Sequence, residues 1–176
     1  IQELIESITE RTILISIMYA NNETGVIQDI KDIGKIAREN NILFMTDATQ
    51  AVGKIKVDVI EDNIDLLTLS AHKLHGPKGV GAVYIKRQYP KIKITPLLHG
   101  GGHEKGYRSG TINVAGIVGL GKAAELSKNN LQEYLSITLP LRNKIEESLC
   151  NIEGVSINGH KENRLPNTTN ISIEGV

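Results

Sequence analysis

Four short apolar runs restrict the folds that this chain can adopt. The first, residues 13–18, is a continuous apolar run of strand length, as expected for a strand covered on both faces. Each of the others is also short enough to be one strand, and a segment with helical spacing separates the first two. Strands that alternate with helices predict an α/β domain with a mainly parallel sheet. The other three runs are residues 42–45, 66–69 and 80–85.

The segment between the first two runs is predicted to be an amphipathic helix. Apolar residues recur at helical spacing through residues 30–37, which gives the segment one apolar side. Asp29 stands where an N-cap would stand, and Asn40-Asn41 ends the helical pattern. This helix would cover one face of the sheet.

The sequence changes character after Thr111. Residues 112–150 predict helix, which Pro140 either interrupts or divides into two, because proline lacks a backbone N–H. The buried side of the last turns is assigned to Leu141, Ile145 and Leu149.

Two short strands, residues 155–157 and 169–173, are expected after these helices. We therefore expect two units. Residues 1–111 would form part of a large α/β domain, and residues 112–176 the connecting helices and the start of a small α+β domain.

Composition excludes several classes of function. The 20 Lys and Arg balance the 20 Asp and Glu, and the only aromatic residues are five Tyr and one Phe, so neither a nucleic acid nor an acidic membrane is an expected partner. No run approaches the roughly 18 apolar residues of a membrane span. A single cysteine excludes an intramolecular disulfide and favours a reducing compartment, the cytoplasm.

Polar side chains follow three of the apolar runs, at the point where each run ends. The carboxyl ends of parallel strands share one edge of a sheet, and ligands bind in the crevice outside that edge. Residues about fifty positions apart would therefore meet in one pocket. The polar residues are Asn21 and Asn22 after the first run, Asp47 and Gln50 after the second, and Ser70, His72 and Lys73 after the third.

Lys73 and Asp47 have the chemistry of a pyridoxal phosphate (PLP) site. An amine at the rim of a sheet, between hydroxyl and imidazole groups and before a glycine-rich turn, suggests a Schiff-base lysine. A buried carboxylate such as that of Asp47 would keep the pyridine nitrogen of the cofactor protonated. The alternatives are a solvated loop lysine and an aspartate that only caps the following turn.

The remaining strand-end residues could hold the other polar groups of PLP. Asn22 and Gln50 can donate neutral hydrogen bonds to the 3'-oxygen. Ser70 and His72, with the glycine-rich turn, can supply donors for the phosphate. Asn22 could instead be a turn residue, and Ser70 an ordinary hydroxyl at a strand end.

Five blocks of this chain resemble, in order, the signature blocks of NifS/IscS-type cysteine desulfurases. These enzymes are class V members of the PLP-dependent aminotransferase family and have fold type I, which is like that of aspartate aminotransferase. The resemblance implies the same PLP-transferase fold for the large domain here. The blocks are residues 21–25, 47–50, 70–73, 76–79 and 99–111.

The resemblance also implies roles for individual residues. Lys73 would form the link to PLP, Asp47 would contact the pyridine nitrogen, and Asn22 and Gln50 would lie near the 3'-oxygen. Ser70 and His72 would hold the phosphate. Thr111 would reach the phosphate of the neighbouring subunit, which implies a homodimer with shared sites.

The whole protein would convert L-cysteine to L-alanine and pass persulfide sulfur to an acceptor scaffold protein for iron–sulfur cluster assembly. The resemblance places the upstream phosphate loop and a ring-stacking histidine before Ile1, and the nucleophilic cysteine and the carboxylate-binding arginine after Val176. We therefore expect an internal fragment that is inactive alone. Cys150, at the end of an amphipathic helix, is expected to be an inert, partly buried thiol.

Alternatives remain for the function. The spacing of His72 with His75, and of His99 with His103, could suit zinc, although no second cysteine exists. Residues 116–123 nearly match a phosphate-binding P-loop, but they lie in a helical pattern, where the glycines would instead allow close helix packing. Selenocysteine lyase, another class V aminotransferase and a non-catalytic scaffold fragment also fit.

Overall fold

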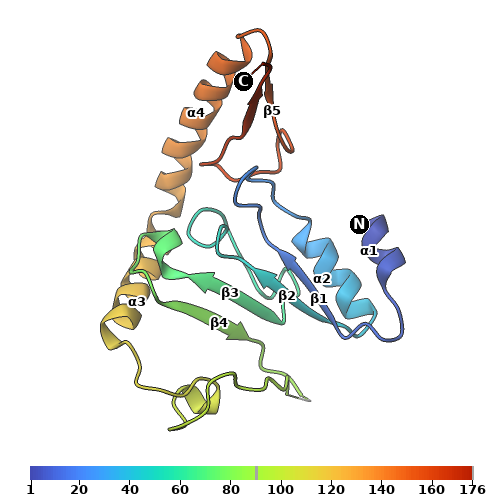
Figure 1. Ribbon diagram of the computed structural model, residues 1–176, viewed down its shortest axis with the longest axis vertical. Coiled ribbons are helices and arrows are strands. Elements are labelled where there is room, and N and C mark those ends of the chain that lie inside the picture. Colours follow the sequence, from blue (N-terminus) through green and yellow to red (C-terminus); the bar gives the residue numbers. More distant parts are fainter. Residues whose placement is uncertain (90, 176) are drawn as a thin grey trace.

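The computed structural model of the chain describes residues 1–89 and 91–175. A four-stranded sheet with strand order β1-β2-β3-β4 lies at its centre (Figure 1). β1, β2 and β3 are parallel, and β4 is antiparallel to β3. The predicted mainly parallel α/β sheet is thus confirmed. The strands are β1 (Leu14–Met18), β2 (Leu43–Asp47), β3 (Leu66–Ser70) and β4 (Gly81–Ile85).

The hydrophobic core lies between the sheet and the helix α2 (Ile30–Glu39). Ile33 and Ala37 of this helix are buried, as is Phe44 of β2. The predicted helix is therefore confirmed, although the side chain of Asp29 makes no capping hydrogen bond. A short helix, α1 (Gln2–Ser7), precedes β1.

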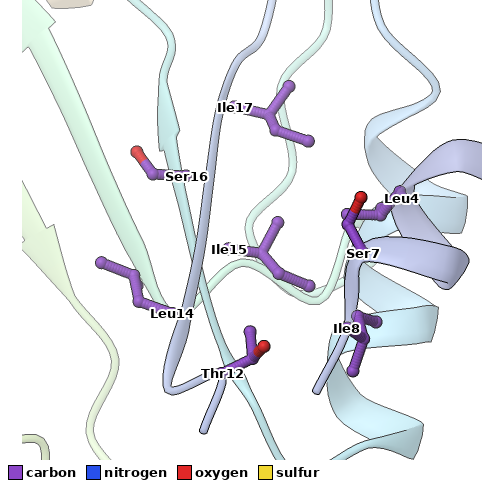
Figure 2. Close-up of a pocket in the computed structure, with 8 residues that line it drawn as sticks. All are labelled: Leu4, Ser7, Ile8, Thr12, Leu14, Ile15, Ser16 and Ile17. Carbon is purple, nitrogen blue, oxygen red and sulfur yellow. The ribbon is translucent and has the colours of Figure 1, made fainter.

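β1 has one covered and one open face within the described residues. Figure 2 shows Ile15 and Ile17 pointing toward α1, while Leu14 and Ser16 point to the opposite side of β1. On that opposite side Leu14 is 41 % exposed and Met18 is 44 % exposed. The expectation that β1 is covered on both faces is thus wrong for these residues, because alternate side chains of β1 remain in solvent.

Gly34 allows α2 to approach the turn before β3. A Cβ atom at this position would lie 2.0 Å from the backbone oxygen of Asp62. Ala is normally about 1 kcal/mol better than Gly inside a helix. Here the contact reverses that preference, since the helix would have to move away from the turn.

We expect Gly34→Ala to destabilise the protein by about 1–3 kcal/mol, the usual cost of overpacking. The matched control is Gly121→Ala, because Gly121 is also helical but has no atom within 4 Å of its added Cβ. That control should be neutral or slightly stabilising in urea unfolding. Equal unfolding midpoints for the two variants would contradict the assigned contact.

The long helical region is divided at Asn130, not at Pro140. It forms α3 (Val114–Asn129) and α4 (Leu131–Cys150), and Pro140 lies inside α4. The prediction that Pro140 breaks or starts a helix is therefore wrong. Asn113 caps α3 by accepting a hydrogen bond from the Gly116 amide.

The buried side of α4 also differs from the prediction. Leu141 and Ile145 are 57 % and 50 % exposed, whereas Glu146 is buried. Glu146 forms an ion pair with Arg164, which is buried as well, so a polar contact sets the orientation of the helix. Cys150 is exposed, which corrects the expectation of a partly buried thiol.

A second, two-stranded antiparallel sheet follows α4, with strands β5 (Val155–Ile157) and β6 (Ile171–Ile173). The segment between them contacts the loop after β1. Ile27 donates its amide to Asn163 O at 2.9 Å, and Leu165 donates to Gly25 O at 2.8 Å. Among the helices described, none is long and apolar enough to cross a membrane.

Candidate functional site

The carboxyl ends of β1, β2 and β3 lie at one edge of the sheet. Met18, Asp47 and Thr68 are partners across the three strands. The ladder continues beyond them, since Tyr19 donates its amide to Asp47 O at 2.8 Å and Ala48 donates to Thr68 O at 3.0 Å. The strand-end segments that were predicted to meet are therefore neighbours.

Lys73 lies on a short 3₁₀-helix, η1 (Ala71–Leu74), that follows β3 directly. Ala71 and Leu74 are buried and anchor this turn, while Lys73 and His72 are exposed. The Ala71 amide donates to Val80 O at 3.0 Å, and its carbonyl accepts from the Gly76 amide at 2.9 Å. A fixed backbone thus presents the amine of Lys73 at the edge where β3 ends.

The turn after η1 packs directly on α3. A Cβ atom at Gly119 would lie 2.5 Å from Pro77 Cγ, so only glycine permits this approach. The prediction that glycines in residues 116–123 allow close packing is confirmed at this position, while Gly121 has open space. The P-loop alternative is wrong, because these residues lie inside α3 rather than between a strand and a helix.

Asp47 is exposed at the end of β2. Its Oδ1 accepts a hydrogen bond from the Thr49 amide at 2.8 Å, which fixes the carboxylate at the start of the next turn. Oδ2 makes no hydrogen bond to the described residues. The turn-capping role and an available carboxylate oxygen therefore coexist.

Gln50 has a partner that the sequence analysis missed. Lys54 Nζ donates a hydrogen bond to Gln50 Oε1 at 2.7 Å. Burial lowers the pKa of Lys54, and the charge of Lys73 lowers it further. The spacing of four residues between Gln50 and Lys54 was the available signal, since this pair can meet where the backbone turns helically.

Three other predicted residues lie in loops, Asn21 and Asn22 after β1 and Thr111 before α3. Asn21 serves the turn after β1, because its Oδ1 accepts from the amides of Glu23 and Thr24, both at 2.9 Å. Asn22 is exposed beside it. Thr111 is exposed in the long loop before α3, and none of its hydrogen bonds among the described residues reaches the strand ends.

A groove lies between α1 and β1 on the surface (Figure 2). It contains none of the strand-end polar residues, and none of its lining residues is ionisable, so it offers no acid or base. Among the described residues, no group of three or more His, Cys, Asp or Glu is arranged to hold a metal. The groove is lined by Leu4, Ser7, Ile8, Thr12 and residues 14–17.

Comparison with known proteins decides the family. The sequence pattern of the family described as aminotransferase class-V matches residues 1–176. The chain belongs to this family.

Other members of the class-V family cover the whole chain. The cysteine desulfurase IscS of Methanosarcina thermophila is 52 % identical over 99 % of this chain and 42 % of its own length. The protein of the same name from Histophilus somni is 47 % identical over 100 % of this chain and 43 % of its own length. The chain therefore spans less than half the length of these relatives.

Solved structures of class-V relatives have the same fold. A NifS-like protein matches with a TM-score of 0.93 and 42 % identity, covering 99 % of this chain and 47 % of that one. A NifS-like protein from Rickettsia africae matches with a TM-score of 0.91 and 37 % identity, covering 99 % of this chain and 48 % of that one. The predicted fold of the large PLP-transferase domain is thus confirmed.

The strand-end residues of this class-V chain fit PLP chemically. The amine of Lys73 is exposed and Asp47 keeps one carboxylate oxygen available. Gln50 accepts at Oε1, so its Nε2 is the end left to donate. Amine, carboxylate and amide donor are three of the groups that the ring of PLP requires.

Proposed function

We propose that the protein is a PLP-dependent cysteine desulfurase, which converts L-cysteine to L-alanine and transfers persulfide sulfur for iron–sulfur cluster assembly. The proposal is carried by the meeting of the Lys73, Asp47 and Gln50 segments at one sheet edge. The relatives named cysteine desulfurase, which are 52 % and 47 % identical to this chain, support it.

In this proposal Lys73 binds PLP and moves protons at the substrate carbon. PLP, when bound, supplies an electron sink for the bonding electrons of the substrate. Asp47 Oδ2 would accept a hydrogen bond from the protonated pyridine nitrogen and keep it protonated, because the Thr49 amide already engages Oδ1 and fixes the carboxylate. Asn22 and Gln50 donate to the 3'-oxygen.

Ser70 and His72 would hold the phosphate beside the turn that follows η1. Their position supports this role, because Ser70 ends β3 and His72 is exposed one residue before Lys73. Thr111 would act across a homodimer interface, which agrees with its exposure and with a hydrogen bond that stays within its own loop. Residues 1–111 would belong to the large domain and residues 112–176 to the connection and the small domain.

The test compares the whole protein with residues 1–176 alone, each supplied with PLP and L-cysteine. We expect the whole protein to form alanine and a cysteine persulfide, and the 176-residue piece to form neither. L-Selenocysteine and other amino acids are assayed in parallel as substrates. A strong preference for one of them over L-cysteine would assign a different class-V activity to the protein. Alanine formation by the piece would contradict the expectation that further catalytic groups are needed.

A further inference from the structure

Lys54 is held against the candidate site by the turn after β2. The amides of Lys54 and Ile55 both donate to Ala51 O, at 3.0 and 3.1 Å, and Ala51 is fully buried. This backbone directs Lys54 Nζ to Gln50 Oε1 at 2.7 Å. The contact is therefore part of an anchored turn rather than a pairing of two free surface side chains.

The surroundings of Lys54 differ from those of an ordinary surface lysine. Other lysines pair with carboxylates, such as Lys56 with Glu61 and Lys86 with Asp65. Among the described residues Lys54 has no ion-pair partner, and its acceptor is the neutral amide of Gln50. A partly buried ammonium without a carboxylate loses solvation that the amide only partly replaces.

The charge of Lys73 also reaches Lys54. Burial lowers the pKa of Lys54 most, and repulsion from the Lys73 ammonium lowers it as well. The amine of Lys73 is therefore near enough for its charge to act on Lys54.

The hydrogen bond settles which end of the Gln50 amide is available. A side-chain amide has an acceptor oxygen at one end and a donor nitrogen at the other, and a half-turn about its last torsion exchanges them. An ammonium can only donate, so it selects Oε1 as its partner. Nε2, with two N–H groups, is then left to face the other side.

We propose that Lys54 is a positioning residue that orients Gln50, so that Nε2 donates to the 3'-oxygen of bound PLP. This inference rests on the proposed function. Without Lys54 the amide would be free to present Oε1, which would repel an ionised 3'-oxygen.

The first measurement needs no cofactor. The side-chain amide signals of Gln50 are followed by ¹⁵N NMR in the whole protein without PLP, for Lys54→Met, Lys54→Arg and the control Lys56→Met. Lys56 is an exposed neighbour that pairs with Glu61, away from Gln50. We expect the Gln50 signals to move and become more mobile in Lys54→Met alone. Unchanged signals in Lys54→Met would overturn the inference.

The second measurement uses PLP as the probe. Lys54→Met should raise the dissociation constant of PLP about three- to tenfold, as expected for one lost hydrogen bond. It should also change the absorption spectrum of bound PLP. The band of the form with an ionised 3'-oxygen should weaken, and the band of the form with a protonated 3'-oxygen should grow. Lys54→Arg, which keeps a donor, should restore both. A wild-type spectrum and affinity in Lys54→Met would overturn this inference alone, whereas absence of PLP binding by the wild-type protein would overturn the proposed function.

Discussion

Replacing Lys73 with alanine should abolish the covalent link to PLP and lower the rate of alanine formation by at least 10²–10⁴-fold, roughly the contribution of one positioned proton-transfer group. The side chain is exposed on η1, while Ala71 and Leu74 anchor the backbone. The variant should therefore fold normally. Loss of activity would then report the missing amine and not a loss of structure.

The measurement pairs absorbance with covalent trapping. Wild-type protein treated with PLP and borohydride should carry the cofactor on Lys73, detected by peptide mass spectrometry, and Lys73→Ala should carry none. The control is Lys35→Ala, because Lys35 is an exposed lysine of α2 whose pairing with Glu39 is a surface contact. Covalent PLP at another lysine, or retained activity in Lys73→Ala, would contradict the assigned role.

The large sheet could be predicted from the sequence because each strand has a local cause. A buried strand needs a short apolar run, and the ends of β1, β2 and β3 fell within one or two residues of the predicted runs. The polar residues that follow each run were then brought together by the parallel arrangement alone. Asp47 and Lys73 reached the same sheet edge for this reason.

The features that were missed depend on the folded backbone and not on local apolar spacing. The apolar spacing of Leu141 and Ile145 predicted a buried stripe, but the ion pair of Glu146 with Arg164 turned another side of α4 inward. No local pattern marks a partner 18 residues away. The bond from Lys54 to Gln50 joins residues only four apart, but it forms only where the backbone turns after β2.

The ion pair of Glu146 with Arg164 should make a large contribution to stability. Glu146 is 7 % exposed and Arg164 is 6 % exposed, so neither charge is well solvated. Arg142 lies close enough for its charge to act on both, and its Nη1 donates to Leu165 O at 2.9 Å. Removing the carboxylate of Glu146 would leave the guanidinium groups of Arg142 and Arg164 to repel each other in a poorly solvated site.

We expect Glu146→Gln to lower the free energy of unfolding by about 3–5 kcal/mol, the usual cost of breaking a buried ion pair. The control is Glu125→Gln, which removes an exposed partner of Lys122 and should cost less than about 1 kcal/mol. Urea unfolding measures both variants. Hydrogen exchange at the Leu165 amide, which donates to Gly25 O, should also become faster in Glu146→Gln.

The effect should depend on pH with a defined sign. Burial raises the pKa of Glu146, but the Thr169 hydroxyl and the guanidinium groups of Arg164 and Arg142 outweigh burial and hold the pKa below its ordinary value. The ionised form therefore favours the folded state, and this stabilisation is complete above the pKa of the unfolded chain. As pH falls below about 4.5, the difference between wild type and Glu146→Gln should shrink. A difference that stays constant or grows on acidification would show that the carboxylate charge is not what holds the segment between β5 and β6 against the loop after β1.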